Sequence, residues 1–134
     1  MGIKAIGRFA PVHVVYTISA GEAADKQIFV ADQDYEIVEV RETHTTAGAS
    51  SSTLDVGVAA SGTAAASLTT SLGSTFALDS TADTPVTGTL TSTLANRNVD
   101  QGEQIALNYT GTVTNYEGAL HIVLNPVRNR NTNY

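Results

Sequence analysis

The sequence has no cysteine and no tryptophan, and only 15% of its 134 residues are charged. The absence of cysteine excludes a disulfide framework, a cysteine-ligated metal site and a thiol nucleophile. No apolar run reaches the roughly 20 residues that a membrane-spanning helix needs, so we expect no membrane partner. The net charge of −6 argues against nucleic acid as a partner, because a nucleic-acid-binding protein needs a basic face that displaces phosphate counterions.

Small and β-branched residues are abundant instead, with 19 threonines and 13 valines. These side chains pack well on a pleated sheet and are restricted in helices. About eight segments have strand-like patterns, and their spacing is close to the 8–12 residues typical of sandwiches and barrels. The segments are 12–20, 25–31, 35–43, 53–60, 64–72, 86–94, 104–110 and 119–125.

Two parts of this pattern are irregular. The alternation in 35–43 slips once at Ile37–Val38, which predicts a β-bulge. The segment 64–72 fits a short helix as well as a strand, and 76–78 fits one helical turn. Strands never alternate with long helical patterns, which disfavours a parallel βαβ fold.

These features predict an all-β protein, a β-sandwich with about eight antiparallel strands. We prefer a jelly roll, since an immunoglobulin-like sandwich has seven strands and its Cys…Trp…Cys framework is absent. The length suits one domain. We expect an N-terminal arm over 1–11, the sandwich over 12–126 and an Asn-rich C-terminal tail over 127–134.

The candidates for chemistry are few. His13, His44 and His121 are the only histidines. We interpret His13 and His121 as strand residues with satisfied nitrogens and His44 as a residue at a loop edge. A metal-dependent hydrolase or isomerase of the cupin type would need all three to converge. We therefore predict no catalytic residue, no metal site, no cofactor and no enzymatic activity.

Asp32, Asp34 and Glu36 form the densest acidic cluster. Oxygen ligands at such spacing can hold Ca²⁺, but the glycine and the distal glutamate of an EF-hand loop are missing. A turn capped by its aspartates is the preferred interpretation.

Several segments carry a resemblance to a known family. The sequence resembles the small jelly-roll capsid decoration (cement) proteins of tailed bacteriophages over roughly 28–126. The resemblance consists of turn placement and strand pattern, and it is strongest in the last two segments. The segments that carry it are 44–48, 54–56, 62–64, 76–82 with Pro85, 99–112 and 118–126.

The resemblance implies a homotrimer on the outer capsid surface of the virion, at threefold positions, where it bridges neighbouring major capsid proteins without catalysis or a cofactor. The two chain ends lie outside the resemblance. We expect them to contact the capsid, because segments that order on contact let a small domain hold a large surface. The expected contact residues are Lys4, Arg8, Phe9, Arg128, Arg130 and Tyr134.

The alternative function is a carbohydrate- or receptor-binding jelly-roll module of a phage tail or head fibre. Such a module needs exposed aromatic side chains. The candidates are Tyr16, Tyr35, Tyr109 and Tyr116, although the alternation of their strands turns most of them toward a core.

Overall fold

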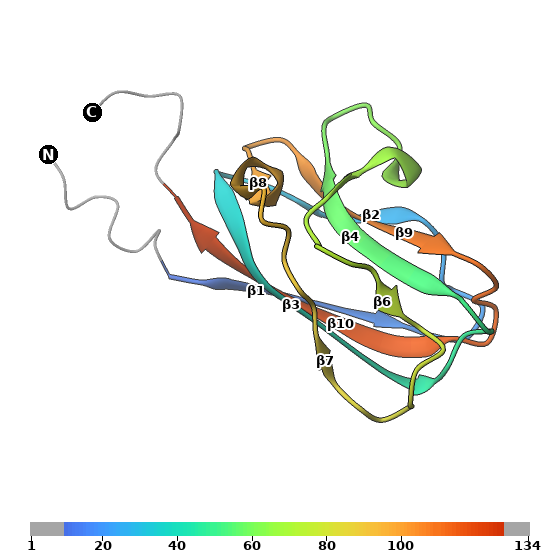
Figure 1. The fold of residues 1–134 in the computed structure, drawn as a ribbon. Helices are drawn as coiled ribbons and strands as arrows, with labels where there is room; N and C mark the ends of the chain where they lie inside the picture. Colours follow the sequence, from blue (N-terminus) through green and yellow to red (C-terminus); the bar gives the residue numbers. More distant parts are fainter. Residues whose placement is uncertain (1–9, 128–134) are drawn as a thin grey trace, which may run out of the picture.

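The computed structural model describes residues 10–127, which form two antiparallel five-stranded sheets packed face to face (Figure 1). Sheet A has the order β1-β10-β3-β7, with β8 also paired to β3; sheet B has the order β2-β9-β4-β5, with β6 also paired to β4. Sheet A consists of β1 (Val12–Ile18), β10 (Glu117–Pro126), β3 (Tyr35–Thr46), β7 (Val86–Thr87) and β8 (Asn98–Val99). Sheet B consists of β2 (Lys26–Val30), β9 (Gln104–Thr110), β4 (Thr53–Ala59), β5 (Thr69–Thr70) and β6 (Phe76–Ala77).

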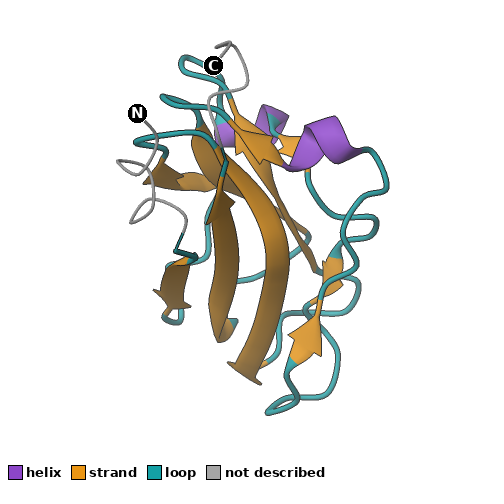
Figure 2. Cartoon of the chain, turned by 90° about the vertical axis from the view of Figure 1, so that its left-hand side faces the viewer, coloured by secondary structure: helices purple, strands orange, loops and turns teal. Residues whose placement is uncertain are grey.

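The strand order is that of a jelly roll. The short strands β5 and β6 both pair with β4, and β7 and β8 both pair with β3, so each pair acts as one interrupted strand. Eight strands then remain, and most connections cross from one sheet to the other. The helical content of the described chain is two 3₁₀ turns, η2 (Ala65–Ser67) and η3 (Leu94–Arg97) (Figure 2). The predicted eight-stranded all-β jelly roll is confirmed.

The core lies between the inner faces of the two sheets. Alternate residues of β4 and β9 point into it, as their sequence pattern predicts: Leu54, Val56, Ile105 and Leu107 have no exposed surface. Sheet A contributes Ile37, Val40, Leu120, Ile122 and Leu124. Close packing of these branched side chains supplies most of the free energy that holds the sheets together.

The predicted bulge is present in β3. Val123 of β10 lies opposite Glu39, and Leu124 lies opposite Ile37, so Val38 has no partner on β10. The extra residue shifts the phase of the alternation, and both Ile37 and Val40 are therefore fully buried.

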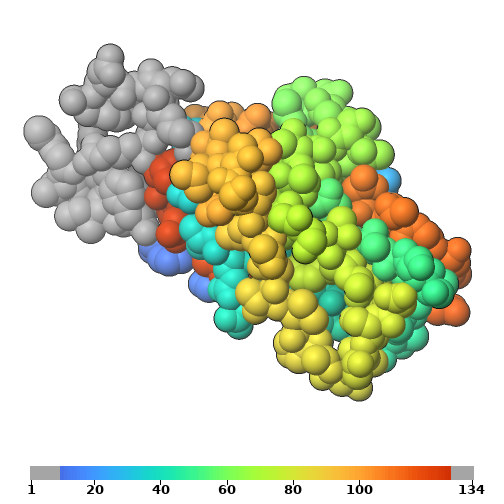
Figure 3. Space-filling model, in the orientation of Figure 1, coloured from blue at the N-terminus to red at the C-terminus, as the bar shows by residue number. Residues whose placement is uncertain are grey.

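Three expectations about the middle of the chain need correction or completion. The segment 76–78 is not a helical turn. Phe76 lies in β6, pairs with Leu54 of β4 and is buried in the core. The strand predicted over 86–94 stops after Val86–Thr87, since the chain then crosses toward sheet B, where Leu90 bridges Leu72. The ambiguous segment 64–72 contains η2 and then β5. Figure 3 shows this middle part, from light green to orange, over the face toward the viewer.

Candidate interaction surface

The two ends of the described chain lie side by side. Val12, the first residue of β1, pairs with Leu124 near the end of β10, so both terminal segments attach at the same end of sheet A (Figure 1). The amide of Val127 donates a hydrogen bond to the Asp34 carbonyl oxygen at 3.0 Å, which holds the exit of β10 against β3. The expected capsid-contact residues lie outside the described residues: Lys4, Arg8, Phe9, Arg128, Arg130 and Tyr134.

Charge is divided sharply between the body and these ends. Residues 10–127 carry all 13 acidic side chains and 3 basic ones, a net charge of −10. The segments 1–9 and 128–134 carry the other 4 basic side chains and no acidic one. The two basic stretches are far apart in the sequence, yet the described chain begins and ends at the same end of sheet A.

Part of the outward side of sheet A is a mixed surface of small, hydroxyl and imidazole side chains with one ion pair, which we call the outer face. Cross-strand partners form its rows: Val15, His121 and Arg41 lie in one row. The side chain of Val15 is 68% exposed. The other residues of the outer face are His13, Thr17, Glu39, Thr43, Ala119 and Val123.

A shallow hollow of about 190 Å³ lies on the outer face. Its lining residues are Val15, Arg41, Glu42, Thr43, Pro85, Ala119, Leu120 and His121. The two charges of the outer face neutralise each other, since Arg41 Nε contacts Glu39 Oε2 at 2.5 Å. On a body with a net charge of −10, such a face lets another protein approach with little electrostatic repulsion.

Strand β1 is an unprotected sheet edge. Within residues 10–127, β1 pairs with β10 alone, and the seven pairs show no register shift. Its sequence, VHVVYTI, contains no proline, glycine or charged residue of the kinds that block edge pairing. The opposite case is β2, the edge of sheet B, which carries Lys26 and a register shift between Gln27 and Phe29. The edge of β1 is therefore available to a strand from another chain.

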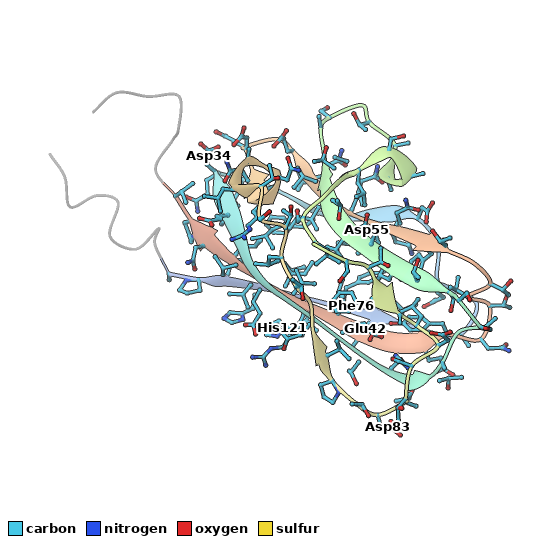
Figure 4. The ribbon with its side chains drawn as sticks, in the orientation of Figure 1. Asp34, Glu42, Asp55, Phe76, Asp83 and His121 are labelled. Atoms are coloured by element: carbon cyan, nitrogen blue, oxygen red, sulfur yellow. The ribbon has the colours of Figure 1, made fainter. Side chains whose placement is uncertain are left out.

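Two of the three histidines meet on the outer face. His13 Nδ1 and His121 Nε2 are 2.9 Å apart, and the ring centroids are 5.1 Å apart. An imidazole nitrogen accepts a hydrogen bond only when it carries no hydrogen, so at least one ring of this pair is neutral. Figure 4 shows His121 on the outward side of sheet A. Both histidines lie within strands, as expected, and this contact engages one nitrogen of each ring.

The third histidine lies on the opposite side of sheet A, inside the core. His44 is 1% exposed, so its assignment to a loop edge is wrong. It continues the phase set by the bulge, because Val40, Glu42 and His44 are alternate residues of β3 and are all buried. Extending the alternation from Val40 by four residues would have predicted that Glu42 and His44 face the core. The three histidines do not converge, so the cupin-type arrangement is absent.

Glu42, His44 and Tyr116 form a buried hydrogen-bonded network. Glu42 Oε2 accepts a bond from the Tyr116 hydroxyl at 2.6 Å and one from His44 Nδ1 at 2.9 Å. His44 Nε2 donates to the Ser80 carbonyl oxygen at 3.0 Å. Both ring nitrogens face acceptors, so His44 is an imidazolium paired with the Glu42 carboxylate. The network ties β3 to the connection between β9 and β10 and to the loop between β6 and β7.

The electrostatics of the network agree with this assignment. Burial alone opposes charge on His44, but the Ser80 carbonyl, the Glu42 carboxylate and the charge of Asp83 outweigh it and raise the pKa of His44. Burial, followed by the bond to Glu42, raises the pKa of Tyr116, which keeps its hydroxyl protonated as a donor.

This raised pKa predicts a pH-dependent stability. The folded protein holds the His44 proton more tightly than the unfolded chain, whose histidine pKa is about 6.5. The His44 contribution is therefore complete below that value and is lost as pH rises through the folded-state pKa. We expect the stability difference between the wild type and His44→Gln to be larger at pH 5.5 than at pH 9, measured by urea unfolding. A difference that is constant or grows with pH would contradict the imidazolium assignment.

The acidic cluster has structural roles. Asp32 Oδ1 accepts a hydrogen bond from the Tyr35 hydroxyl, and Asp34 Oδ1 accepts one from the Gln101 amide at 2.8 Å. Glu36 lies in β3 opposite Asn98 and Asn125. The chain bends at this cluster, but these two aspartates bind a tyrosine side chain and the distant turn at Gln101, which differs from the capping of their own turn that we predicted. In the chain from 10 to 127, no three His, Asp or Glu side chains are grouped as a metal site.

The tyrosines that a sugar-binding site would need face the interior. Tyr35 and Tyr116 are buried, and Tyr109 is half-buried with its hydroxyl oxygen fully enclosed. Tyr16 is half-buried beneath the Lys26 ammonium, which lies 5.5 Å from the ring centroid. These side chains form no exposed aromatic platform. None of the helices in the described part is long and apolar enough to span a membrane.

Comparison with known proteins rests on structure. No family model matches the chain, and no curated protein matches its sequence. Among solved structures, a chain from the capsid of Ralstonia phage GP4 is similar, with a TM-score of 0.59 and 15% sequence identity. The match covers 89% of this chain and 86% of the phage chain. At this identity the likeness shows a shared jelly-roll fold.

Proposed function

We propose that this protein is a non-enzymatic structural protein of a bacteriophage virion. Within that class we propose a decoration, or cement, protein that binds the outer surface of the head and stabilises contacts between major capsid proteins. The observation that carries the proposal is the fold shared with a chain of a phage capsid. The match covers nearly equal shares of the two chains, 89% of this one and 86% of the phage chain.

The arrangement of the chain ends supports capsid attachment. Both basic terminal segments attach at one end of sheet A, so the two can contact the same region of a capsid. The contact residues we propose are Lys4, Arg8, Phe9, Arg128, Arg130 and Tyr134. Basic ends favour an acidic patch on the partner.

We propose a homotrimer as the assembled form. Three copies would present three pairs of basic ends, and simultaneous binding would multiply the effect of each modest contact. The edge of β1, which pairs only with β10 among the described strands, is the surface best suited to contact a neighbouring copy. The alternative, a carbohydrate- or receptor-binding module, is less well supported because the tyrosines face the interior.

The assembly prediction is tested by light scattering after size exclusion. We expect a species of about 42 kDa, three times the chain mass of 14.0 kDa. A monomer at all concentrations up to the millimolar range would contradict a preassembled trimer.

The attachment prediction is tested by deleting residues 1–11. We expect the truncated protein to lose binding to undecorated heads of the phage that encodes it, measured by co-sedimentation. The body should stay folded, because β1 begins at Val12 and the core lies within the described sandwich. A charge-reversal variant replaces Lys4 and Arg8 with glutamate and tests the arm. Its matched control is Lys26→Glu, which reverses a charge on the body. Binding that survives the deletion, or that the Lys26→Glu control loses equally, would refute the role of the arm.

A further inference from the structure

We propose that His13 and His121 form a two-histidine chelate for a divalent first-row transition metal ion. The two nitrogens that would bind, His13 Nδ1 and His121 Nε2, are 2.9 Å apart on adjacent strands of the outer face. Imidazole nitrogen is a preferred ligand for Cu²⁺, Ni²⁺ and Zn²⁺. The proposal is independent of the proposed capsid role.

The distance between the nitrogens selects a coordination geometry. Metal–nitrogen bonds of about 2.0–2.1 Å that meet at a right angle place the two nitrogens about 2.9 Å apart. A tetrahedral angle would place them about 3.3 Å apart. The spacing is therefore compatible with adjacent positions of a square-planar or octahedral ion, and the Irving–Williams order places the affinity for Cu²⁺ above that for Ni²⁺ or Zn²⁺.

The strands hold the two side chains at this spacing. In the ladder of β1 and β10, His13 is opposite Val123 and Val15 is opposite His121, so the histidines are diagonal neighbours on one face. In the metal-free arrangement one ring nitrogen donates its hydrogen to the other. For a metal ion to bind, the hydrogen of the donating ring moves to the other nitrogen of that ring by exchange with solvent, and the rings rotate so that both lone pairs point to the ion. The exposure of His13 leaves room for this rotation.

The charges around the pair permit a cation. Arg41 lies in the same row as His121, but its guanidinium is paired with the Glu39 carboxylate. The described body carries a net charge of −10, which attracts a dication. Because the outer face is open to solvent, water or a donor from another chain can fill the remaining coordination positions.

The third histidine, His44, is not available as a ligand of the proposed site. His44 is buried, and both of its nitrogens are already engaged by Glu42 and Ser80. It cannot join the pair, because it lies on the other side of sheet A. The chelate is therefore limited to two histidine nitrogens.

The test is a titration of the full chain, without a histidine tag, with Cu²⁺, Ni²⁺ and Zn²⁺ in a non-coordinating buffer at pH 7.5. Calorimetry should give one site per chain, with a higher affinity for Cu²⁺ than for Ni²⁺ or Zn²⁺. His13→Asn and His121→Asn should each weaken Cu²⁺ binding about tenfold or more, because each leaves a single ligand. Thr17→Asn, on the same strand and face, should leave it unchanged.

Electron paramagnetic resonance of the Cu²⁺ complex supplies a second readout. We expect hyperfine splitting from two equivalent imidazole nitrogens in the wild type and from one nitrogen in either histidine variant. Equal affinity of the wild type and both histidine variants, or a wild-type spectrum without two imidazole nitrogens, would overturn the proposal.

Discussion

Replacing Glu42 with alanine is expected to lower the free energy of unfolding by about 3–5 kcal/mol, which is the usual cost of removing one partner of a buried ion pair. Glu42 Oε2 accepts hydrogen bonds from both His44 and Tyr116. Its removal leaves a buried imidazolium without a counter-charge and a buried hydroxyl without an acceptor. Denaturant unfolding at pH 6, where His44 is charged in the folded state, measures the change.

The matched control is Glu39→Ala in the same strand. Glu39 pairs with Arg41 on the exposed side of sheet A, and surface ion pairs contribute about 0–1 kcal/mol. If Glu42→Ala fails to fold, Tyr116→Phe still tests the network, with an expected loss of about 1–3 kcal/mol. The network would be refuted if both Glu42→Ala and Tyr116→Phe cost no more than Glu39→Ala.

Replacing Gly57 with alanine is expected to destabilise the fold by about 2–3 kcal/mol, at the upper end of the usual cost of overpacking. A Cβ atom at this position would lie 2.1 Å from the Thr69 carbonyl oxygen and 2.8 Å from Leu68 Cδ1. Gly57 is paired with both Thr70 of β5 and Ala106 of β9. The backbone of β4 therefore has no free direction in which to move, and thermal or denaturant unfolding should show the loss.

Gly62→Ala separates this steric effect from backbone strain. Gly62 has a φ of +86°, and a Cβ atom at this position would meet no other atom within 4 Å. Alanine there suffers only the left-handed backbone penalty of about 1 kcal/mol. Gly57→Ala should cost clearly more than Gly62→Ala. The reverse order would show that β5 does not approach β4 as closely as the structure indicates.

The local pattern of the chain was sufficient to predict much of the architecture. Alternation in β4 and β9 identified Leu54, Val56, Ile105 and Leu107 as core residues, and the slip at Ile37–Val38 located the bulge. These features depend on neighbours two residues apart, and a side-chain period of two is written directly in the sequence.

The middle of the chain was harder to predict. The segment 86–94 has the composition of a strand, yet only Val86–Thr87 pair with β3. Likewise, Phe76 becomes part of a strand because β4 offers it a partner in Leu54. Threonine, alanine and serine fit loops and strands almost equally, so the partner available in space decides the outcome.

By itself, the sequence determined the all-β class, the positions of the long strands and the excess of negative charge, because composition and alternation are local properties. Only the tertiary structure decided that His13 meets His121 across 108 residues, that Glu42 and His44 lie inside, and that the basic ends attach side by side. The physical reason is that pairing between strands is a long-range choice. It depends on how whole sheets close over a common core, and no window of neighbouring residues contains that information.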